Sequence, residues 1–213
     1  MSTRVWFWDT IARRYARTPI ADQASYEQKL AFTRAYFSPL SRVLEIGCGT
    51  GSTAILHAPY VEHYHAIDCS GQMLEIARQK VAESALANLS FEQATIERLD
   101  SPKGEWDAVL AMSVLHLLDH RGAALRKIHS LLKSGGVFIS STICLGDSPL
   151  KFRMLAPLFR MLPFMPRFTA FKRDELIADI ESAGFKVEKI WCPGPNKAVF
   201  IVARRQSSRA ASA

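Results

Sequence analysis

The sequence predicts an α/β protein in which helices cover both faces of a mostly parallel sheet. Three observations predict this class. A short apolar run at 43–46 leads into a glycine turn and then a helix start. Strand-like and helical stretches then alternate as far as residue 142. Two further strand-like runs close the chain as a hairpin around 193–196.

The elements follow in order along the chain. Five strands are predicted at 43–46, 63–68, 89–94, 106–112 and 137–142, and the hairpin strands at 186–191 and 198–202. Helices are predicted from residue 4 to the Thr18-Pro19 break, and at 22–37, 72–85, 123–132 and 174–183. We expect Ser70 and Asp174 to cap the helices that follow them, and Gly135 to be left-handed just after helix 123–132.

At 213 residues the chain is expected to form one domain with a single core. The first ten residues lack an apolar leader, and no run of about 18 uncharged apolar residues occurs, so we expect a cytoplasmic protein. The four cysteines contain no C-x-x-C pair, which favours reduced thiols over a disulfide framework or a metal site.

The formal net charge of +7 is concentrated in two segments. Residues 150–173 contain six lysines or arginines and no acid, and residues 204–213 add three arginines. We interpret 146–173 as a basic, apolar insert on the substrate side, and 204–213 as a disordered tail. A basic balance permits nucleic acid, an anionic membrane surface or an anionic substrate as partner.

The stretch 43–53 carries most of the functional information. Its three alternate glycines are Gly47, Gly49 and Gly51. They permit positive φ and let a ligand lie against the backbone, and the helix start just beyond favours an anionic group. A dinucleotide fingerprint needs glycine at position 52, where the chain has Ser52. Glu45 would repel a pyrophosphate, so it favours a ligand that carries an ammonium group.

This Glu-x-Gly-x-Gly-x-Gly stretch is followed by Asp68, which ends the next strand, and by Asp-x-Ser-x-x-Met-Leu at 68–74. The combination resembles class I S-adenosylmethionine-dependent methyltransferases, a broad group that includes ubiquinone and menaquinone methyltransferases. The resemblance covers 40–142 by motif and 172–203 by pattern. It implies a Rossmann-like three-layer sandwich, a seven-stranded mostly parallel sheet with an antiparallel last strand, and S-adenosyl-L-methionine as the cofactor.

The resemblance also implies a role for each site residue. The glycines would lie along the methionine moiety, Glu45 would orient its amino group, and Asp68 would accept hydrogen bonds from the ribose hydroxyls. Where the family has an adenine-reading acid this chain has Thr95, so the Thr95 hydroxyl or the Ile96 N–H would contact the ring. The predicted cofactor-binding residues are Glu45, Gly47, Cys48, Gly49, Thr50, Gly51, Asp68, Cys69, Met73, Thr95, Ile96 and Met112.

Two residues are candidates for catalysis. His116 follows the fourth strand at the sheet edge where ligands bind, and a histidine there can accept a proton from a thiol, a phenol or an acidic carbon. His120 is the second choice, and the alternative for His116 is simple packing at a helix start. The resemblance further implies that residues 1–37 form a helical lid over the cofactor, from which Tyr15 reaches it. The alternative for Tyr15 is core packing.

The acceptor is inferred from what surrounds the site. Residues 112–115 read Met-Ser-Val-Leu, so the Asn-Pro-Pro-Tyr of amino-methylating nucleic-acid enzymes is absent, and a nucleic-acid acceptor is disfavoured. The insert interleaves phenylalanine, leucine and methionine with its basic residues, which favours a pocket wall for a small or lipid-like acceptor. Two other interpretations stay open: an amphipathic segment on an anionic membrane surface, or a lid that only completes the core.

We therefore predict an S-adenosylmethionine-dependent methyltransferase that acts on a small or amphipathic acceptor by in-line transfer, without a metal. Alternatives are a lipid-headgroup or quinone methyltransferase at the membrane surface, a small-thiol S-methyltransferase, and a non-catalytic protein that binds the same cofactor. A nicotinamide oxidoreductase is disfavoured by Ser52. The sequence does not indicate the oligomeric state.

Overall fold

The computed structural model describes residues 5–82, 84, 86–147 and 168–206. Its strands are β1 (Arg42–Ile46), β2 (His63–Asp68), β3 (Leu89–Gln93), β4 (Trp106–Met112), β5 (Leu132–Thr142), β6 (Phe185–Trp191) and β7 (Val199–Arg205). Its α-helices are α1 (Val5–Arg17), α2 (Gln23–Arg34), α3 (Ser52–His57), α4 (Gly71–Ala82), α5 (Arg121–Leu131) and α7 (Arg173–Ser182). The order of strands and helices follows the prediction.

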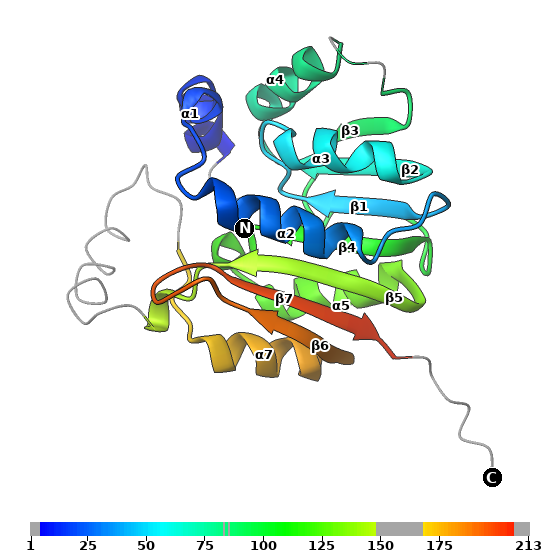
Figure 1. The fold of residues 1–213 in the computed structure, drawn as a ribbon, viewed down its shortest axis with the longest axis vertical. Helices are drawn as coiled ribbons and strands as arrows, with labels where there is room; N and C mark the ends of the chain where they lie inside the picture. Colours follow the sequence, from blue (N-terminus) through cyan, green and yellow to red (C-terminus); the bar gives the residue numbers. More distant parts are fainter. Residues whose placement is uncertain (1–4, 83, 85, 148–167, 207–213) are drawn as a thin grey trace.

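The strands form one sheet in the order β3-β2-β1-β4-β5-β7-β6, which is the middle layer in Figure 1. The pairings from β3 to β5 are parallel, whereas β7 runs antiparallel to both β5 and β6. The predicted seven-stranded sheet with an antiparallel last strand is therefore confirmed. The order of the strands reverses between β1 and β4, with β2 and β3 on one side and β5 on the other, so the carboxyl ends of these two central strands define the crevice where ligands bind in such sheets.

Helices cover both faces of the sheet because its strands bury side chains on both sides. On one face, Leu74 of α4 belongs to the same buried cluster as Leu110 of β4, and α2 and α3 cover this face too. On the other face, Leu125 of α5 and Ile180 of α7 share a cluster with Val109. The neighbours Val109 and Leu110 thus point to opposite faces, as the pleat of a strand requires.

The two predicted N-terminal helices are present, and α1 lies beside α4 (Figure 1). The contact is specific at the start of α4. Asp9 accepts hydrogen bonds from Ser70 Oγ (2.6 Å) and from Gln72 N (3.2 Å). Ser70 Oγ also accepts from Met73 N at 3.1 Å, which confirms that Ser70 caps α4. These bonds fix α1 next to the carboxyl edge of β2.

The passage from α5 to β5 differs from the prediction. The helix ends at Leu131, and β5 begins at once with Leu132, so no loop separates them. Gly135 does have a positive φ of 78°, but it lies inside β5 rather than at a helix end. The β4–β5 register shifts in this region, from Trp106 opposite Leu132 to Ala108 opposite Val137. The glycine therefore permits an irregularity in the strand, which is a second common use of this residue.

Two predictions near the end of the chain are wrong. Helix α7 begins at Arg173, so Asp174 lies in its first turn and does not cap it. The Arg173 N–H donates instead to Asp147 Oδ2 at 2.8 Å, a partner that lies far away in sequence. The expected tail also starts too early, because Arg204 and Arg205 belong to β7. Arg204 forms an ion pair with Glu188 (2.6 Å), which holds its charge against β6. Residues 207–213 lie outside the described residues.

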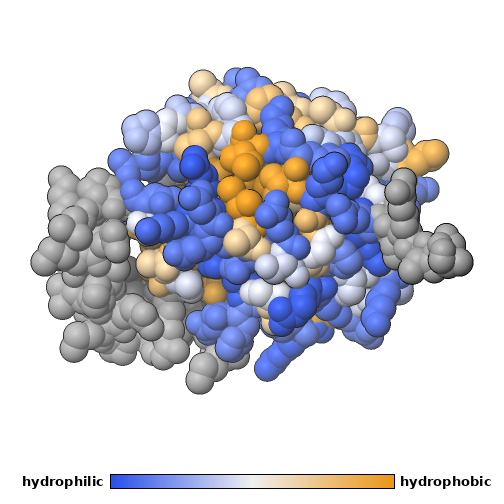
Figure 2. Space-filling model, turned by 90° about the horizontal axis from the view of Figure 1, so that it is seen from below, coloured by the Kyte–Doolittle hydropathy of each residue, from blue (hydrophilic) through white to orange (hydrophobic). Residues whose placement is uncertain are grey.

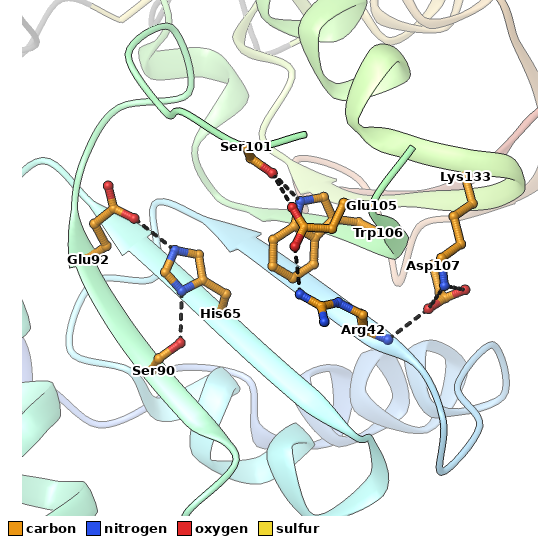
Figure 3. A network of polar contacts seen from close by, with 9 residues as sticks. All are labelled: Arg42, His65, Ser90, Glu92, Ser101, Glu105, Trp106, Asp107 and Lys133. Atoms are coloured by element: carbon orange, nitrogen blue, oxygen red, sulfur yellow. Dashed lines mark hydrogen bonds and ion pairs between the residues drawn. The ribbon is translucent and has the colours of Figure 1, made fainter. Parts of the chain in front are cut away.

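A polar network joins the amino ends of the central strands, away from the ligand crevice (Figure 3). Arg42 forms an ion pair with Glu105 at 2.6 Å, and its backbone N–H donates to Asp107 Oδ2 at 2.8 Å. Ser101 Oγ donates to Glu105 (2.7 Å) and accepts from Trp106 Nε1 (2.8 Å). Residues 94–105, all of which are described, form no helix between β3 and β4. The hydrogen bonds of Ser101 with Glu105 and Trp106 hold this long connection to the start of β4.

The surface in Figure 2 is mostly hydrophilic, with one compact apolar patch within it. On the edge strand β6 the exposed apolar side chain is Ile190, at 47% exposure, and its neighbours on the strand include Lys186, Glu188 and Lys189. Charges on an edge strand oppose pairing with another sheet. Among the described residues, no helix has both the length and the apolar character needed to cross a bilayer.

Candidate active site

The glycine turn between β1 and α3 has the backbone that the sequence predicted. Gly47, Gly49 and Gly51 have φ of 65°, 55° and 73°, in the left-handed region that side chains rarely adopt. A Cβ on Gly47 would lie 2.7 Å from Val114 Cγ2, and one on Gly51 would lie 2.9 Å from the Cβ of Ala77. A Cβ on Gly49 would meet only a Tyr15 ring carbon, at 3.8 Å. The space above Gly49 is therefore free for a ligand.

Asp68 joins the end of β2 to this turn. Its Oδ2 accepts a hydrogen bond from Gly49 N at 2.8 Å, and its Oδ1 accepts from Ser70 N at 2.9 Å. Burial raises the pKa of Asp68, and the two backbone donors oppose that rise. The carboxylate is thus oriented from both sides at the place where the resemblance predicts a ribose.

Glu45 lies beneath the turn and is almost completely buried, with 1% exposure. Its Oε2 accepts a hydrogen bond from Tyr64 Oη at 2.9 Å. Burial raises the pKa of Glu45 to about 8; the Tyr64 hydrogen bond opposes the rise, and the nearby Asp68 charge adds to it. Glu45 is therefore protonated at neutral pH in the ligand-free protein, and a cation placed beside it would ionise it.

Two adjoining cavities open at the carboxyl edge of the sheet, with volumes of about 260 and 370 Å³. Both are lined by Tyr15, Gly47, Gly49, Met112 and Ser113. The first also contains the predicted residues Asp68, Cys69, Met73, Thr95, Ile96 and His116. The second contains Glu45, Cys48 and Thr50. Of the predicted cofactor-binding residues, Gly51 alone lines neither cavity, because it packs against α4 and β3.

The predicted adenine contacts lie in a turn after β3. Ala94 N donates to Asp68 O at 3.1 Å, which keeps this turn beside the end of β2. Thr95 O accepts from the N–H groups of Arg98 and Leu99, at 3.0 and 2.9 Å. Thr95 and Ile96 both line the first cavity, and their contact with adenine stays a prediction.

His116 lies in a short 3₁₀ turn after β4 and is buried, with 8% exposure. Its ring is nearly parallel to that of Phe168, at 6° and with 5.9 Å between the ring centres. Its backbone oxygen accepts from Thr169 N at 2.8 Å. Its Nδ1 is buried without a hydrogen-bond partner, and burial lowers the pKa of His116 to about 4. The imidazole is therefore neutral at physiological pH, and Phe168 and Thr169, described residues near the end of the insert, hold it in place.

Tyr15 reaches the site from α1. Its side chain lines both cavities and is 51% exposed, so the alternative of core packing is wrong. Desolvation, together with the charges of Asp68 and Glu45, raises the pKa of Tyr15. Its hydroxyl therefore stays protonated and is available as a hydrogen-bond donor. His120, the second candidate base, lines neither cavity.

Several residues at the site were not identified from the sequence. Ser113 has a positive φ of 59°, unusual for a residue with a side chain, and its N–H donates to Ser141 O at 2.7 Å. Tyr26 of α2 lines the second cavity, and its hydroxyl lies 3.3 Å from Thr53 Oγ1. Trp8 of α1 lines the first cavity. The apolar spacing of α1 placed Trp8 on a helix, but no local signal marks Ser113 or Tyr26.

Within the described residues, no group of three or more histidine, cysteine, aspartate or glutamate side chains is arranged to hold a metal ion. Most of the predicted insert, residues 148–167, lies outside the described residues. The two ends of the insert are described, and they meet where Gly146 N donates to Phe171 O at 2.8 Å.

Comparison with known proteins agrees with this geometry. A family model described as a methyltransferase domain matches residues 43–136. The uncharacterised methyltransferase YcgJ of Bacillus subtilis is 33% identical over 98 residues, which are 46% of this chain and 39% of that protein. The ubiquinone/menaquinone biosynthesis C-methyltransferase of Geotalea daltonii is 25% identical over 207 residues, covering 84% of this chain and 86% of that protein. The chain thus spans about two fifths of the first relative and most of the second.

Among solved structures, a geranyl diphosphate methyltransferase in complex with S-adenosylmethionine has a TM-score of 0.69 at 13% identity, covering 84% of each chain. At that identity the likeness shows the fold. The chain therefore has the fold of S-adenosylmethionine-dependent methyltransferases, and its segment 43–136 matches a methyltransferase-domain model. The predicted resemblance, fold class and cofactor are therefore confirmed.

Proposed function

We propose that this chain transfers the methyl group of S-adenosyl-L-methionine to a small or amphipathic acceptor. The observation that carries the proposal is the pair of cavities that share the glycine turn, Met112 and Ser113 as a common wall. A transfer reaction needs two ligands whose reacting atoms meet; the predicted cofactor residues line both cavities, and the first cavity has further apolar lining beside them that can take the acceptor.

The residues of the turn fit the cofactor. The open space above Gly49 admits a ligand against the backbone, and the oriented carboxylate of Asp68 suits a ribose diol. Glu45 would ionise beside the amino group of the methionine moiety. When bound, the cofactor supplies a methyl group on a positively charged sulfur. The chain's part is to hold both ligands in line and to exclude water from the reacting atoms.

The first cavity supports an apolar acceptor with one polar group. Beyond the predicted cofactor residues its lining includes Trp8, Leu117, Leu118 and Ile143, with His116 and Glu97 among the polar members. Such a lining favours a ring or an alkyl chain over a highly charged acceptor. The Geotalea relative is named for a C-methylation step in ubiquinone and menaquinone biosynthesis, which supports a quinol-type ring as one member of this class.

His116 is the residue that we propose to contact the acceptor. A neutral imidazole can accept a proton from a thiol or a phenol as the new bond forms, or donate a hydrogen bond that orients the acceptor. Its low pKa makes it a weak base, so the proposal fits an acceptor that needs little help to lose its proton. Phe168 and Thr169 keep the ring at the cavity wall.

The test is release of S-adenosylhomocysteine in the presence of a quinol ring, a lipid amine or a small aromatic thiol. We expect turnover with at least one acceptor that combines a ring or alkyl body with a single polar group. Tight binding of S-adenosylmethionine without product from any of the three would contradict the proposal, and would favour the non-catalytic alternative.

Membrane association is a separate part of the proposal, and it concerns the basic insert. Co-sedimentation of the whole chain with vesicles that contain an anionic phospholipid tests it, with neutral vesicles as the control. Binding to the anionic vesicles alone would support delivery of a lipid-like acceptor. Equal recovery in the supernatant with both kinds of vesicle would discard this part and leave a soluble acceptor.

A further inference from the structure

The side chain of Lys80, on α4, extends to the glycine turn and donates its hydrogen bonds there. Its Nζ donates to Thr50 O at 3.0 Å, to Thr50 Oγ1 at 3.0 Å and to Ser52 Oγ at 3.1 Å. An ammonium group has three N–H donors, so these three acceptors use its full capacity. All three belong to the turn or to the first residue of α3, and no sequence motif pointed to this lysine.

The positive charge of Lys80 is not neutralised by these bonds. Its three partners are uncharged oxygens, and among the described residues no carboxylate lies within ion-pair distance of it. Burial lowers the pKa of Lys80, because the ammonium has lost part of its water. The chain therefore holds a partly desolvated cation directly behind the turn, where its field is screened less than that of a fully exposed lysine.

The other side of the turn is held by β2. Cys48 N donates to Ile67 O at 3.0 Å, and Gly49 N donates to Asp68 Oδ2 at 2.8 Å. Lys80 holds the next residue, Thr50, from α4. Thr50 lines the second cavity, the one that contains Glu45, whereas Asp68 lines the first. Lys80 therefore holds a residue of the turn that lines the second cavity, whereas Asp68 itself lines the first.

We propose that Lys80 is a positioning residue for the cofactor. It fixes the turn at Thr50 in its binding conformation, and its charge favours the carboxylate at the amino-acid end of the ligand. This inference rests on the proposed cofactor site. It goes beyond that site by assigning a role to Lys80, which lines neither cavity, and by predicting that its charge acts on the amino-acid end of the ligand.

The experiment compares two ligands by calorimetry. S-adenosylhomocysteine has the amino-acid end, and 5′-methylthioadenosine lacks it. Lys80→Met removes the charge and the donors but keeps most of the apolar stem. Arg78→Met is the matched control, because Arg78 lies on the same helix and donates to Phe91 O at 3.3 Å instead of to the turn.

We expect Lys80→Met to weaken S-adenosylhomocysteine about tenfold, because the ligand carboxylate loses a nearby, partly desolvated positive charge, and to weaken 5′-methylthioadenosine less than about twofold. Lys80→Arg, which keeps the charge, should lose less, and Arg78→Met should bind both ligands as the parent chain does. Equal losses for the two ligands, or no loss for either, would overturn the inference.

Two measurements distinguish a failure of this inference from a failure of the cofactor site or of folding. A parent chain that binds neither ligand refutes the cofactor site itself, and this inference with it. The unfolding midpoint of each ligand-free variant reports the fold. Should Lys80→Met fail to fold, Lys80→Arg decides: it must retain a preference for S-adenosylhomocysteine over 5′-methylthioadenosine close to that of the parent chain, and loss of that preference would overturn the inference.

Discussion

Binding of the cofactor should release a proton from Glu45, and this prediction follows directly from its surroundings. The side chain is buried and its pKa is raised to about 8, so at pH 7 most of the molecules carry a protonated Glu45. The ligand's ammonium group favours the ionised carboxylate and lowers this pKa in the complex. Binding at pH 7 should therefore release close to one proton for each ligand bound.

The sign and size of the pH dependence follow from the same value. The complex binds fewer protons than the free protein, so raising the pH favours binding. Between about pH 6 and 8 the affinity should rise by up to about tenfold per pH unit, and it should level off above the free pKa of about 8. Tyr64 donates to Glu45, and removing that donor by Tyr64→Phe should shift the levelling point to higher pH.

The assay is titration calorimetry with S-adenosylhomocysteine at pH 7 in phosphate and in Tris, whose ionisation enthalpies differ. The difference in apparent binding enthalpy gives the number of protons released. Glu45→Gln keeps the size of the side chain and cannot ionise, so it should release almost none and bind with little pH dependence. A parent chain that releases no proton, or a Glu45→Gln variant that releases the same number, would refute the reasoning.

Three further predictions concern single residues. Gly51→Ala should lower the free energy of unfolding, measured in urea, by about 1–3 kcal/mol, because its new Cβ meets α4. Gly135→Ala, also at positive φ but with nothing within 4 Å of the new Cβ, should lower it by about 1 kcal/mol. Equal losses would contradict this. His57 is buried with both ring nitrogens unpaired, and its pKa is lowered to about 3. As the pH falls below about 6.5, His57 is protonated in the unfolded chain before it is protonated in the folded one, so the free energy of unfolding falls by up to about 1.4 kcal/mol per pH unit. In His57→Phe the melting temperature should therefore depend less on pH between about 4.5 and 6.5 than in the parent chain. The same pH dependence in both proteins would disprove this. His116→Ala and Phe168→Ala should each lower kcat several-fold while the Kd for S-adenosylhomocysteine stays within about twofold. Since the pKa of His116 is about 4, kcat of the parent chain should show no step near pH 6.5. Unchanged turnover in His116→Ala would remove the proposed base.

The parts of the fold that depend on local sequence were predictable. Three alternate glycines after an apolar run specify a turn with positive φ, and the structure has it. Asp68 ends the next strand, and Ser70, placed three residues before Met73, caps α4 as predicted. In each case the residues that cause the structure lie within a few positions of one another, so their spacing carries the information.

The parts that depend on distant neighbours were not predictable from one sequence. Asp147 supplies the first turn of α7 with an acceptor from 26 residues away, so the local choice of Asp174 as a cap failed. The raised pKa of Glu45 depends on burial, which the local sequence does not specify. Lys80 faces the turn from 28–30 residues away. Such pairings arise only once the elements have packed together.

The central claim is that the glycine turn and the Asp68 carboxylate together hold an S-adenosyl nucleoside. Calorimetry with S-adenosylhomocysteine, beside NADH and the variant Asp68→Asn, tests it most directly. We predict binding of S-adenosylhomocysteine by the parent chain, a loss of about tenfold or more in Asp68→Asn, and no heat from NADH. Binding of NADH in its place, or no heat from S-adenosylhomocysteine, would contradict the account.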